Sequence, residues 1–225
     1  MRWFLAQVAT IAEKDLRLEF RSRERLLTMV TFAALVAVIF SFALDPTVRA
    51  RSILGAMLWV TVLFAGTLGL GRSFALEREQ ETLTGVLLAP VNRGALYLGK
   101  FLANLVILLL VELVIFPVYA LFFQASFAGS YLGLTAVVVL ATIGFIALGT
   151  LFSAMTAHTR LGDTLLPILL LPLMIPVVIF AAGATQRLLV GRPIEEIAAS
   201  LRMLLAFDLI YLAVCTTLFQ YVVDE

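Results

Sequence analysis

Residues 101–123 read FLANLVILLLVELVIFPVYALFF, an almost wholly apolar run that contains one ionisable carboxyl, Glu112. A helix needs about 20 such residues to cross the hydrocarbon core of a bilayer, so this stretch is long enough to span it. Five further runs of the same kind occupy residues 26–44, 53–70, 132–155, 164–183 and 204–223. The runs are continuous, whereas strands of a membrane barrel would alternate apolar and polar residues. We therefore expect an all-α integral membrane protein with six transmembrane helices in a single domain, residues 1–225.

The overall composition supports this class. Of the 225 residues 62% are hydrophobic and 14% are charged, whereas a soluble domain typically carries about 25% charged residues. The formal net charge of +1 gives no reason to expect a nucleic acid as a partner. The one cysteine, Cys215, lies inside an apolar run. This excludes a disulfide framework and predicts a small, buried hydrophobic residue.

Lysine and arginine residues gather on one side of the predicted spans. They precede the first span and lie between spans two and three and between spans four and five, so most of them share the side that holds both chain ends. By the positive-inside rule this side faces the cytoplasm. We therefore expect a multi-pass protein with both termini in the cytoplasm.

Two segments outside the spans have amphipathic patterns. Residues 1–25 contain a helix with an apolar and a basic side, the pattern of a helix that lies in the headgroup plane. Asp15 and Glu19 are exceptions, because they fall on the apolar side. Residues 184–203 also mix apolar with charged side chains, and we expect them to form short helices that cap the external face.

The densest charge in the chain lies between the second and third predicted spans, where residues 77–90 read EREQETLTGVLLAP. As a helix that ends before Pro90, this stretch has an apolar side and a polar side. It is too polar to enter lipid, and two interpretations remain open: a solvated loop, or a helix that docks on a cytoplasmic protein. On the docking interpretation the contact residues are Glu77, Glu81, Thr82, Leu83, Val86, Leu87 and Pro90.

Several residues of segment 72–90 match a pattern that follows the second span in permeases of the ABC exporter type, Phe-x-x-Glu…Gly-(Ser/Thr)-Leu-Glu-x-Leu-Leu-x-x-Pro. The matching residues are Phe74, Glu77, Thr82, Leu83, Leu87 and Pro90. Glu81 stands where glycine is usual, and Thr84 stands where glutamate is usual. In those permeases the segment is a coupling helix that inserts into a groove of the ATP-hydrolysing subunit. The resemblance therefore implies that a separate ATPase docks here.

A second match lies in the fifth predicted span. Residues 169–181 read LLLPLMIPVVIFA, in which Pro172 and Pro176 are the paired prolines. This pattern, with the length, number and order of the spans, resembles the haem exporter protein B (CcmB) family of the cytochrome c maturation apparatus. The resemblance implies an ABC transporter permease of the bacterial inner membrane that acts in haem delivery or haem-chaperone release. It also implies a CcmA-like ATPase and CcmC-like and CcmD-like membrane subunits as partners, with haem in the assembled complex.

Three prolines and two acids are the notable residues inside the predicted spans. Pro167, Pro172 and Pro176 each remove a helical hydrogen bond, so we expect the fifth span to be bent or partly unwound, as a fixed bend or a moving gate. Glu112 lies midway along the third span, where an ionisable group costs about 2.5–3.5 kcal/mol. It fits a transport role, as a proton site or a contact for cargo, and equally a hydrogen-bonded carboxyl that packs two helices together. We expect Asp208, near the outer end of the sixth span, at the membrane interface.

The sequence contains no set of residues typical of an enzyme. His158, the one histidine, lies in a predicted cytoplasmic loop, and without a second ligand near it in sequence it defines no haem or metal site. Residues 94–101 read GALYLGKF and fit the start of a phosphate-binding P-loop, but Phe101 stands where serine or threonine must hold magnesium. We therefore expect ATP hydrolysis in a partner subunit.

Three functions remain open from the sequence. The first is the haem-related transporter subunit that the resemblance implies. The second is an ABC exporter permease for another substrate, such as a lipid, drug or polysaccharide, and a gene neighbourhood without cytochrome maturation components would favour it. The third is a non-conducting membrane anchor for an ATPase complex, which a lining without polar residues would favour. Six spans are half of a usual exporter, so a second membrane half is expected.

Overall fold

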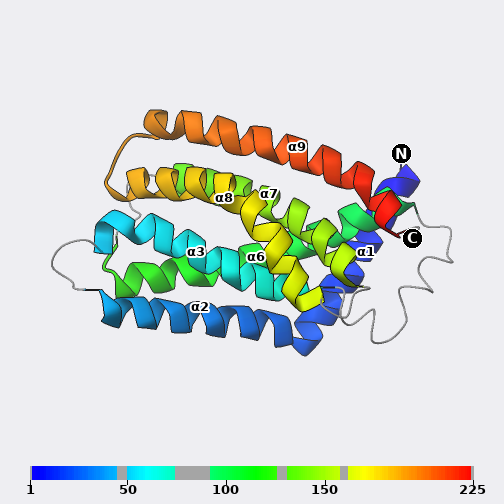
Figure 1. The fold of residues 1–225 in the computed structure, drawn as a ribbon, viewed down its shortest axis with the longest axis horizontal. Helices are drawn as coiled ribbons and strands as arrows, with labels where there is room; N and C mark the ends of the chain where they lie inside the picture. The colour runs from blue at the N-terminus through cyan, green and yellow to red at the C-terminus, as the bar shows by residue number, and fades with distance from the viewer. Residues whose placement is uncertain (1, 45–49, 74–91, 126–130, 158–161, 224–225) are drawn as a thin grey trace.

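The structure is a computed structural model that describes residues 2–44, 50–73, 92–125, 131–157 and 162–223. These residues form no strand, and their helices lie together in one bundle (Figure 1). The elements are α1 (Arg2–Ser22), α2 (Glu24–Ala43), α3 (Ala50–Gly71), α6 (Arg93–Phe122), α7 (Tyr131–Ala157), α8 (Gly162–Leu189), the 3₁₀ helix η1 (Ile194–Ile197) and α9 (Ala198–Val223). By length and composition, α2, α3, α6, α7, α8 and η1–α9 are able to cross a membrane. The prediction of an all-α protein with six membrane-spanning helices is confirmed.

The six long helices run back and forth between two ends of the bundle, as Figure 1 shows. One end holds α1 and the last turn of α9, and we call it the terminal end. The other holds η1, and we call it the η1 end. Helices are the expected elements here, because each satisfies its backbone hydrogen bonds within itself, as the interior of a bilayer requires.

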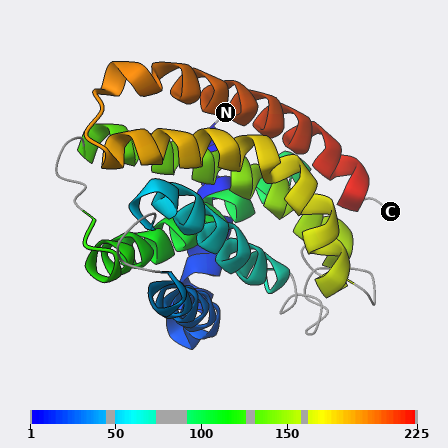
Figure 2. The ribbon, with the colours of Figure 1, turned by 60° about the vertical axis from the view of Figure 1, so that its left-hand side comes forward.

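Central and peripheral helices differ in how much of their surface the bundle covers. In the most apolar 18-residue stretch of each helix, 67% of the stretch is buried in α3 and 56% in α7, whereas the share is 17% in α2 and 22% in η1–α9. Figures 1 and 2 show α2 and α9 on opposite edges of the bundle. Cys215 of α9 faces inward and is fully buried, as predicted.

The N-terminal helix α1 packs against α6 at the terminal end. Val8 of α1 is buried, and Ile11 lies so close to Gly99 of α6 that a Cβ atom on Gly99 would come within 2.7 Å of it. Small residues allow such close approach between helices. The apolar side of α1 that the sequence predicts therefore faces protein. Leu18 and Phe20 remain exposed on α1, so the helix also offers apolar side chains to its surroundings.

The three prolines of the fifth span lie inside one continuous helix, α8. Figures 1 and 2 show α8 as a bent ribbon, and all residues from Gly162 to Leu189 remain helical. Of the two outcomes that the sequence left open, bending and partial unwinding, the structure shows bending.

Residues 184–203, which the sequence predicts to form short helices, are divided among three elements, of which only η1 is short. The structure continues α8 to Leu189, places the 3₁₀ helix η1 at Ile194–Ile197 and begins α9 at Ala198. The physical reason is that apolar residues on both sides extend the spans, so the break is confined to the turn at Gly191, which adopts a positive φ of 77°, and to Pro193, which lacks an amide hydrogen and cannot continue a helix.

Candidate functional site

Glu112 lies in the interior of the bundle, where α6 meets α7, and is 2% exposed. Its oxygens Oε1 and Oε2 are each 2.9 Å from the hydroxyl of Thr142 in α7. The same hydroxyl lies 2.7 Å from the carbonyl oxygen of Val138, one turn earlier, a common bond for threonine inside a helix. The described residues provide no ion pair to Glu112. The carboxyl therefore joins two helices without a counter-charge.

A small cavity lies beside this carboxyl. It is lined by residues of α3, α6, α7 and α8, among them Trp59, Phe145 and Met174. Its volume is about 10 Å³, which is at the lower limit of what one water molecule needs. A pocket for a drug-sized ligand measures roughly 300–1,000 Å³. In this conformation the cavity beside Glu112 has room for one water molecule at most and is closed to a larger cargo.

The two prolines of the sequence pattern, Pro172 and Pro176, lie in the bent part of α8. Pro172 is exposed and Pro176 is half-buried. The hydroxyl of Tyr211 in α9 donates to the carbonyl oxygen of Leu173, which lies between them, at 3.1 Å. Helix α9 is thus hydrogen-bonded to the bend, and a change of bend would have to break or move this bond.

The predicted docking residues lie outside the described residues. These are Glu77, Glu81, Thr82, Leu83, Val86, Leu87 and Pro90. The residues on either side of them are described. Ser73 donates its hydroxyl to Oδ1 of Asn104 in α6 at 3.0 Å, and the backbone amide of Asn92 donates to Oε1 of Gln7 in α1 at 3.3 Å. Asn92 also caps α6 by accepting from the amide of Gly94 at 2.9 Å.

A polar cluster at the terminal end joins four helices. Arg25 of α2 donates to Oδ1 of Asn104 at 2.8 Å, and Nδ2 of Asn104 donates to the hydroxyl of Thr150 in α7 at 3.1 Å. Lys100, which is 1% exposed, forms an ion pair of 3.2 Å with Asp15 of α1. The partners of Asn104 come from distant parts of the chain, so no local sequence pattern could find them.

The two acids that interrupt the apolar side of α1 are explained by their partners. Asp15 pairs with Lys100, and Glu19 accepts a hydrogen bond from the backbone amide of Leu26 at 3.0 Å. Glu19 is 9% exposed. They fix α1 to the start of α2 and to α6, which the amphipathic pattern did not predict.

Asp208 does not have the interfacial position that the sequence predicts. It is 3% exposed and faces Gly144 of α7. The expectation failed because α9 begins at Ala198, six residues before the predicted start of the span at residue 204, so Asp208 lies deeper in the bundle. His158 lies outside the described residues. Across the described part of the chain, no group of three His, Cys, Asp or Glu residues could hold a metal ion.

Comparison with known proteins shows the family. A model of the family described as "CcmB protein" matches residues 6–223. The protein named "Heme exporter protein B" of Rhodobacter capsulatus is 32% identical over 187 residues, which is 82% of this chain and 85% of that protein. Proteins of the same name from Pseudomonas aeruginosa and Escherichia coli are 31% identical over 181 residues and 30% identical over 195 residues. These matches cover 80% and 85% of this chain, and 81% and 87% of the two relatives.

The family match covers all six long helices, the buried Glu112 and the bent α8. The chain is thus a multi-pass bacterial membrane protein, and it belongs to the CcmB protein family.

Proposed function

We propose that this chain is the membrane subunit of an ABC transporter that acts in haem delivery or haem-chaperone release for cytochrome c maturation. The observation that carries this proposal is the match of nearly the whole chain to the CcmB family and to relatives named as haem exporters. The family name implies the cytochrome c maturation system. The inner membrane is its location, and the terminal end faces the cytoplasm because the basic residues gather on that side.

Its ATPase is a separate, CcmA-like subunit that docks on residues 77–90. The hydrogen bonds of Ser73 and Asn92, on either side of this segment, support the proposal, because they join its two ends to α6 and to α1. A movement of the segment caused by the ATPase would therefore be transmitted directly to α6 and to α1. CcmC-like and CcmD-like membrane subunits complete the complex. Glu112, Pro172 and Pro176 serve the transport step inside the membrane.

The docking proposal is tested with a tagged chain, purified in a gentle detergent and analysed for the proteins that accompany it. In the double variant Leu83→Asp/Leu87→Asp we expect the ATPase to be lost while the chain stays in the membrane, since two charges would replace the apolar docking side. Val190→Asp is the matched control: Val190 is 67% exposed at the η1 end, so this variant should keep the ATPase. Co-purification of the ATPase with the double variant at the wild-type level would show that the docking segment lies elsewhere.

The partners that accompany the wild type test the haem function. An ATPase together with CcmC-like and CcmD-like proteins supports it, and a haem absorption spectrum of the complex then locates haem. An ATPase with only a second copy of this chain would contradict it and would indicate an exporter of another cargo.

The transport role of Glu112 is tested by Glu112→Ala. We expect this variant to fold and to lose transport-linked activity, because its side chain has no polar atom to place beside Thr142. Full activity of the variant would assign Glu112 to helix packing alone.

A further inference from the structure

Two carboxyls lie at the same depth in the bundle, in different helices. Glu112 is about 15 Å from the end of α6 at Phe122, at the helical rise of 1.5 Å per residue. By the same measure Asp208 is about 15 Å from the start of α9 at Ala198. Both of those helix ends lie at the η1 end. Because the hydrocarbon core of a bilayer is about 30 Å thick, this depth is close to its middle.

Helix α7 separates the two carboxyls. Glu112 contacts Thr142 of α7, and Asp208 lies against Gly144, where a Cβ atom would come within 2.7 Å of its Oδ1. Residues two positions apart in a helix point about 200° away from each other. The acids therefore face α7 from opposite sides, one through α6 and the other through α9.

The hydrogen bonds around Glu112 fit its protonated form. The Thr142 hydroxyl has one proton, yet it lies within bonding distance of both Glu112 oxygens and of the Val138 carbonyl. If Glu112 carries a proton, it donates to the threonine oxygen, and the threonine donates to the carbonyl. Both protons then have an acceptor, and no charge is buried. An ionised Glu112 would hold a full charge with one neutral donor, which is costly in a dry interior.

Asp208 has even fewer partners. Neither Oδ1 nor Oδ2 has a hydrogen-bond partner within the part of the chain that the structure describes, although the residue is 3% exposed. The backbone amide of Gly144 faces the carboxyl, but an amide inside an α-helix is already donated to the carbonyl four residues earlier. A charged carboxylate in this position would be unpaired, which costs far more than a neutral acid.

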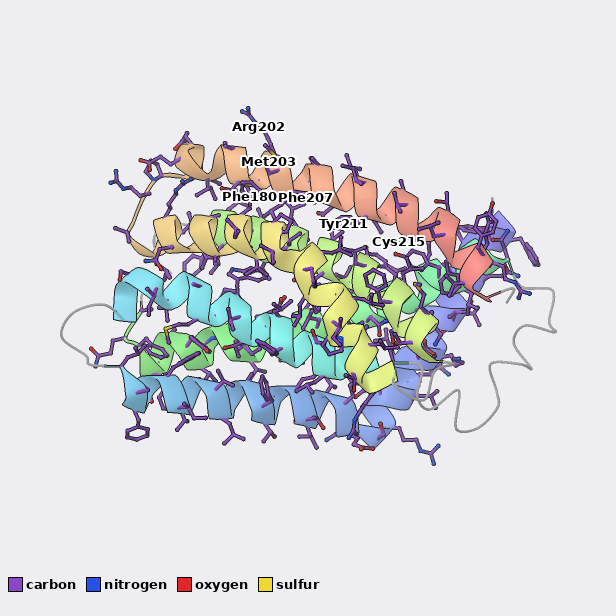
Figure 3. All side chains as sticks on the ribbon, in the orientation of Figure 1. Phe180, Arg202, Met203, Phe207, Tyr211 and Cys215 are labelled. Carbon is purple, nitrogen blue, oxygen red and sulfur yellow. The ribbon has the colours of Figure 1, made fainter. Side chains whose placement is uncertain are left out.

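Aromatic side chains pack between α8 and α9 beside Asp208. Figure 3 shows Phe180 of α8 next to Phe207 and Tyr211 of α9, while Arg202 points away from the bundle. The ring centres of Phe180 and Phe207 are 6.2 Å apart, and those of Phe207 and Tyr211 are 5.7 Å apart. This row of rings packs α9 against α8 beside the residue that carries the carboxyl.

No described ion pair neutralises either acid. The residues that line the cavity beside Glu112 are uncharged except for Glu112 itself. No described ion pair or hydrogen bond links Asp208 to a titratable or charged residue of the elements around it. The described residues of this kind are Tyr131 of α7, Arg187 of α8, Glu195 and Glu196 of η1, Arg93, Tyr97, Lys100, Glu112 and Tyr119 of α6, and Arg202, Tyr211, Cys215 and Tyr221 of α9 itself.

We propose that Glu112 and Asp208 form a pair of proton-binding sites on opposite sides of α7, and that α9 packs against α7 only while Asp208 carries its proton. Separation of α9 from α7 lets water reach Asp208 and releases the proton, and closure takes it up again. The proton binding does not depend on the proposed function. If the chain also moves in a transport cycle, the separation of α9 from α7 during that cycle releases the proton of Asp208.

The test is infrared spectroscopy of the purified full-length chain in lipid bilayers at neutral pH. Exposed carboxyls are ionised there, so a carbonyl stretch of a protonated carboxylic acid reports buried, neutral acids. In the wild type we expect such a band, with a component that shifts when aspartate is labelled with ¹³C at its carboxyl. Asp208→Asn should remove the label-sensitive component, and Glu112→Gln should remove the rest. Glu13→Gln, which changes an exposed, ion-paired carboxyl, is the matched control and should leave the band intact.

The labelled wild type alone suffices if a variant fails to fold. Absence of any label-sensitive acid band at neutral pH would overturn the proposal for Asp208, and persistence of that component in Asp208→Asn would do the same. The second arm is heat stability. The wild type should lose stability as the pH rises from neutral, because the packed state holds protons that the open state releases, and Asp208→Asn should flatten this dependence. None of these measurements requires the ATPase, so their failure would leave the docking proposal untouched.

Discussion

The terminal end and the middle of the bundle treat buried acids in opposite ways. At the terminal end Asp15 has the ammonium groups of Lys100, at 3.2 Å, and Lys14, at 3.1 Å, within ion-pairing distance. In the middle, Glu112 has one threonine hydroxyl, and Asp208 has no described partner. The sequence shows only that each acid interrupts an apolar surface.

The difference follows from depth. Near the end of the bundle, a buried charge is close to water and to the side chains of other charged residues. The free-energy cost of burying an ion pair is therefore low enough to be tolerated there. Near the middle of the bilayer, both the desolvation of a charge and the absence of water oppose ionisation. An acid at that depth is therefore expected to be neutral unless a cation lies beside it.

The largest expected effect is a contrast between two identical substitutions. Asp15→Asn leaves the ammonium of Lys100 buried beside a neutral amide, and we expect it to lower stability by about 3 kcal/mol, at the low end for a broken buried pair because Asp15 is partly exposed. Asp208→Asn replaces a neutral acid by a neutral amide and should change stability little. Thermal unfolding in detergent, followed by the remaining monodisperse fraction, measures both. Equal losses of stability in Asp15→Asn and Asp208→Asn would contradict the difference between the terminal end and the middle of the bundle.

The packing of α9 on α7 is tested at glycine positions. Gly144→Ala places a methyl group 2.7 Å from Oδ1 of Asp208, and we expect a loss of about 2 kcal/mol from overpacking. Gly183→Ala is the matched control, because its added methyl meets no atom within 4 Å, and alanine favours the helix by up to about 1 kcal/mol. The same heat-stability measurement should give opposite signs for the two variants. If Gly144→Ala left the heat stability unchanged, α7 would not approach Asp208 as closely as the structure shows.

A double-mutant cycle sharpens the role of the Thr142 hydroxyl. Thr142→Val removes the partner of a buried carboxyl and should cost about 1–2 kcal/mol. Combined with Glu112→Leu, the loss should become smaller than the sum of the single losses, since replacing both partners by apolar groups removes the unsatisfied atom. Strictly additive losses would mean that the hydroxyl and the carboxyl are not coupled.

The smallest effect is expected at an exposed ion pair. Arg192 and Glu196 lie 3.5 Å apart at the η1 end with side chains that are 61% and 43% exposed. Glu196→Gln should therefore change stability by less than about 1 kcal/mol, because water and salt screen such pairs. A large loss would mean that charge pairs matter at both ends of the bundle alike.

The helices were predictable from the sequence, and their ends and partners were less so. Continuous apolar runs identify six spans without any knowledge of packing. The sixth span was placed at residues 204–223, whereas α9 begins at Ala198, because a charge such as Arg202 ends a hydropathy run but does not end a helix whose long side chain points outward (Figure 3). This offset of six residues made Asp208 look interfacial. The contacts of Asn104 and Glu112 join segments far apart in the chain, so no local pattern reveals them.

The burial of Cys215 makes this chain a natural background for site-directed labelling. A thiol held inside a helix bundle reacts slowly, because reagents attack an exposed thiolate, and this is the one cysteine of the sequence. Cysteines introduced at exposed positions such as Val190 and Leu121 will therefore take up a fluorophore or spin label selectively. Distances between helices can then be followed during a working cycle in a protein that is otherwise wild type.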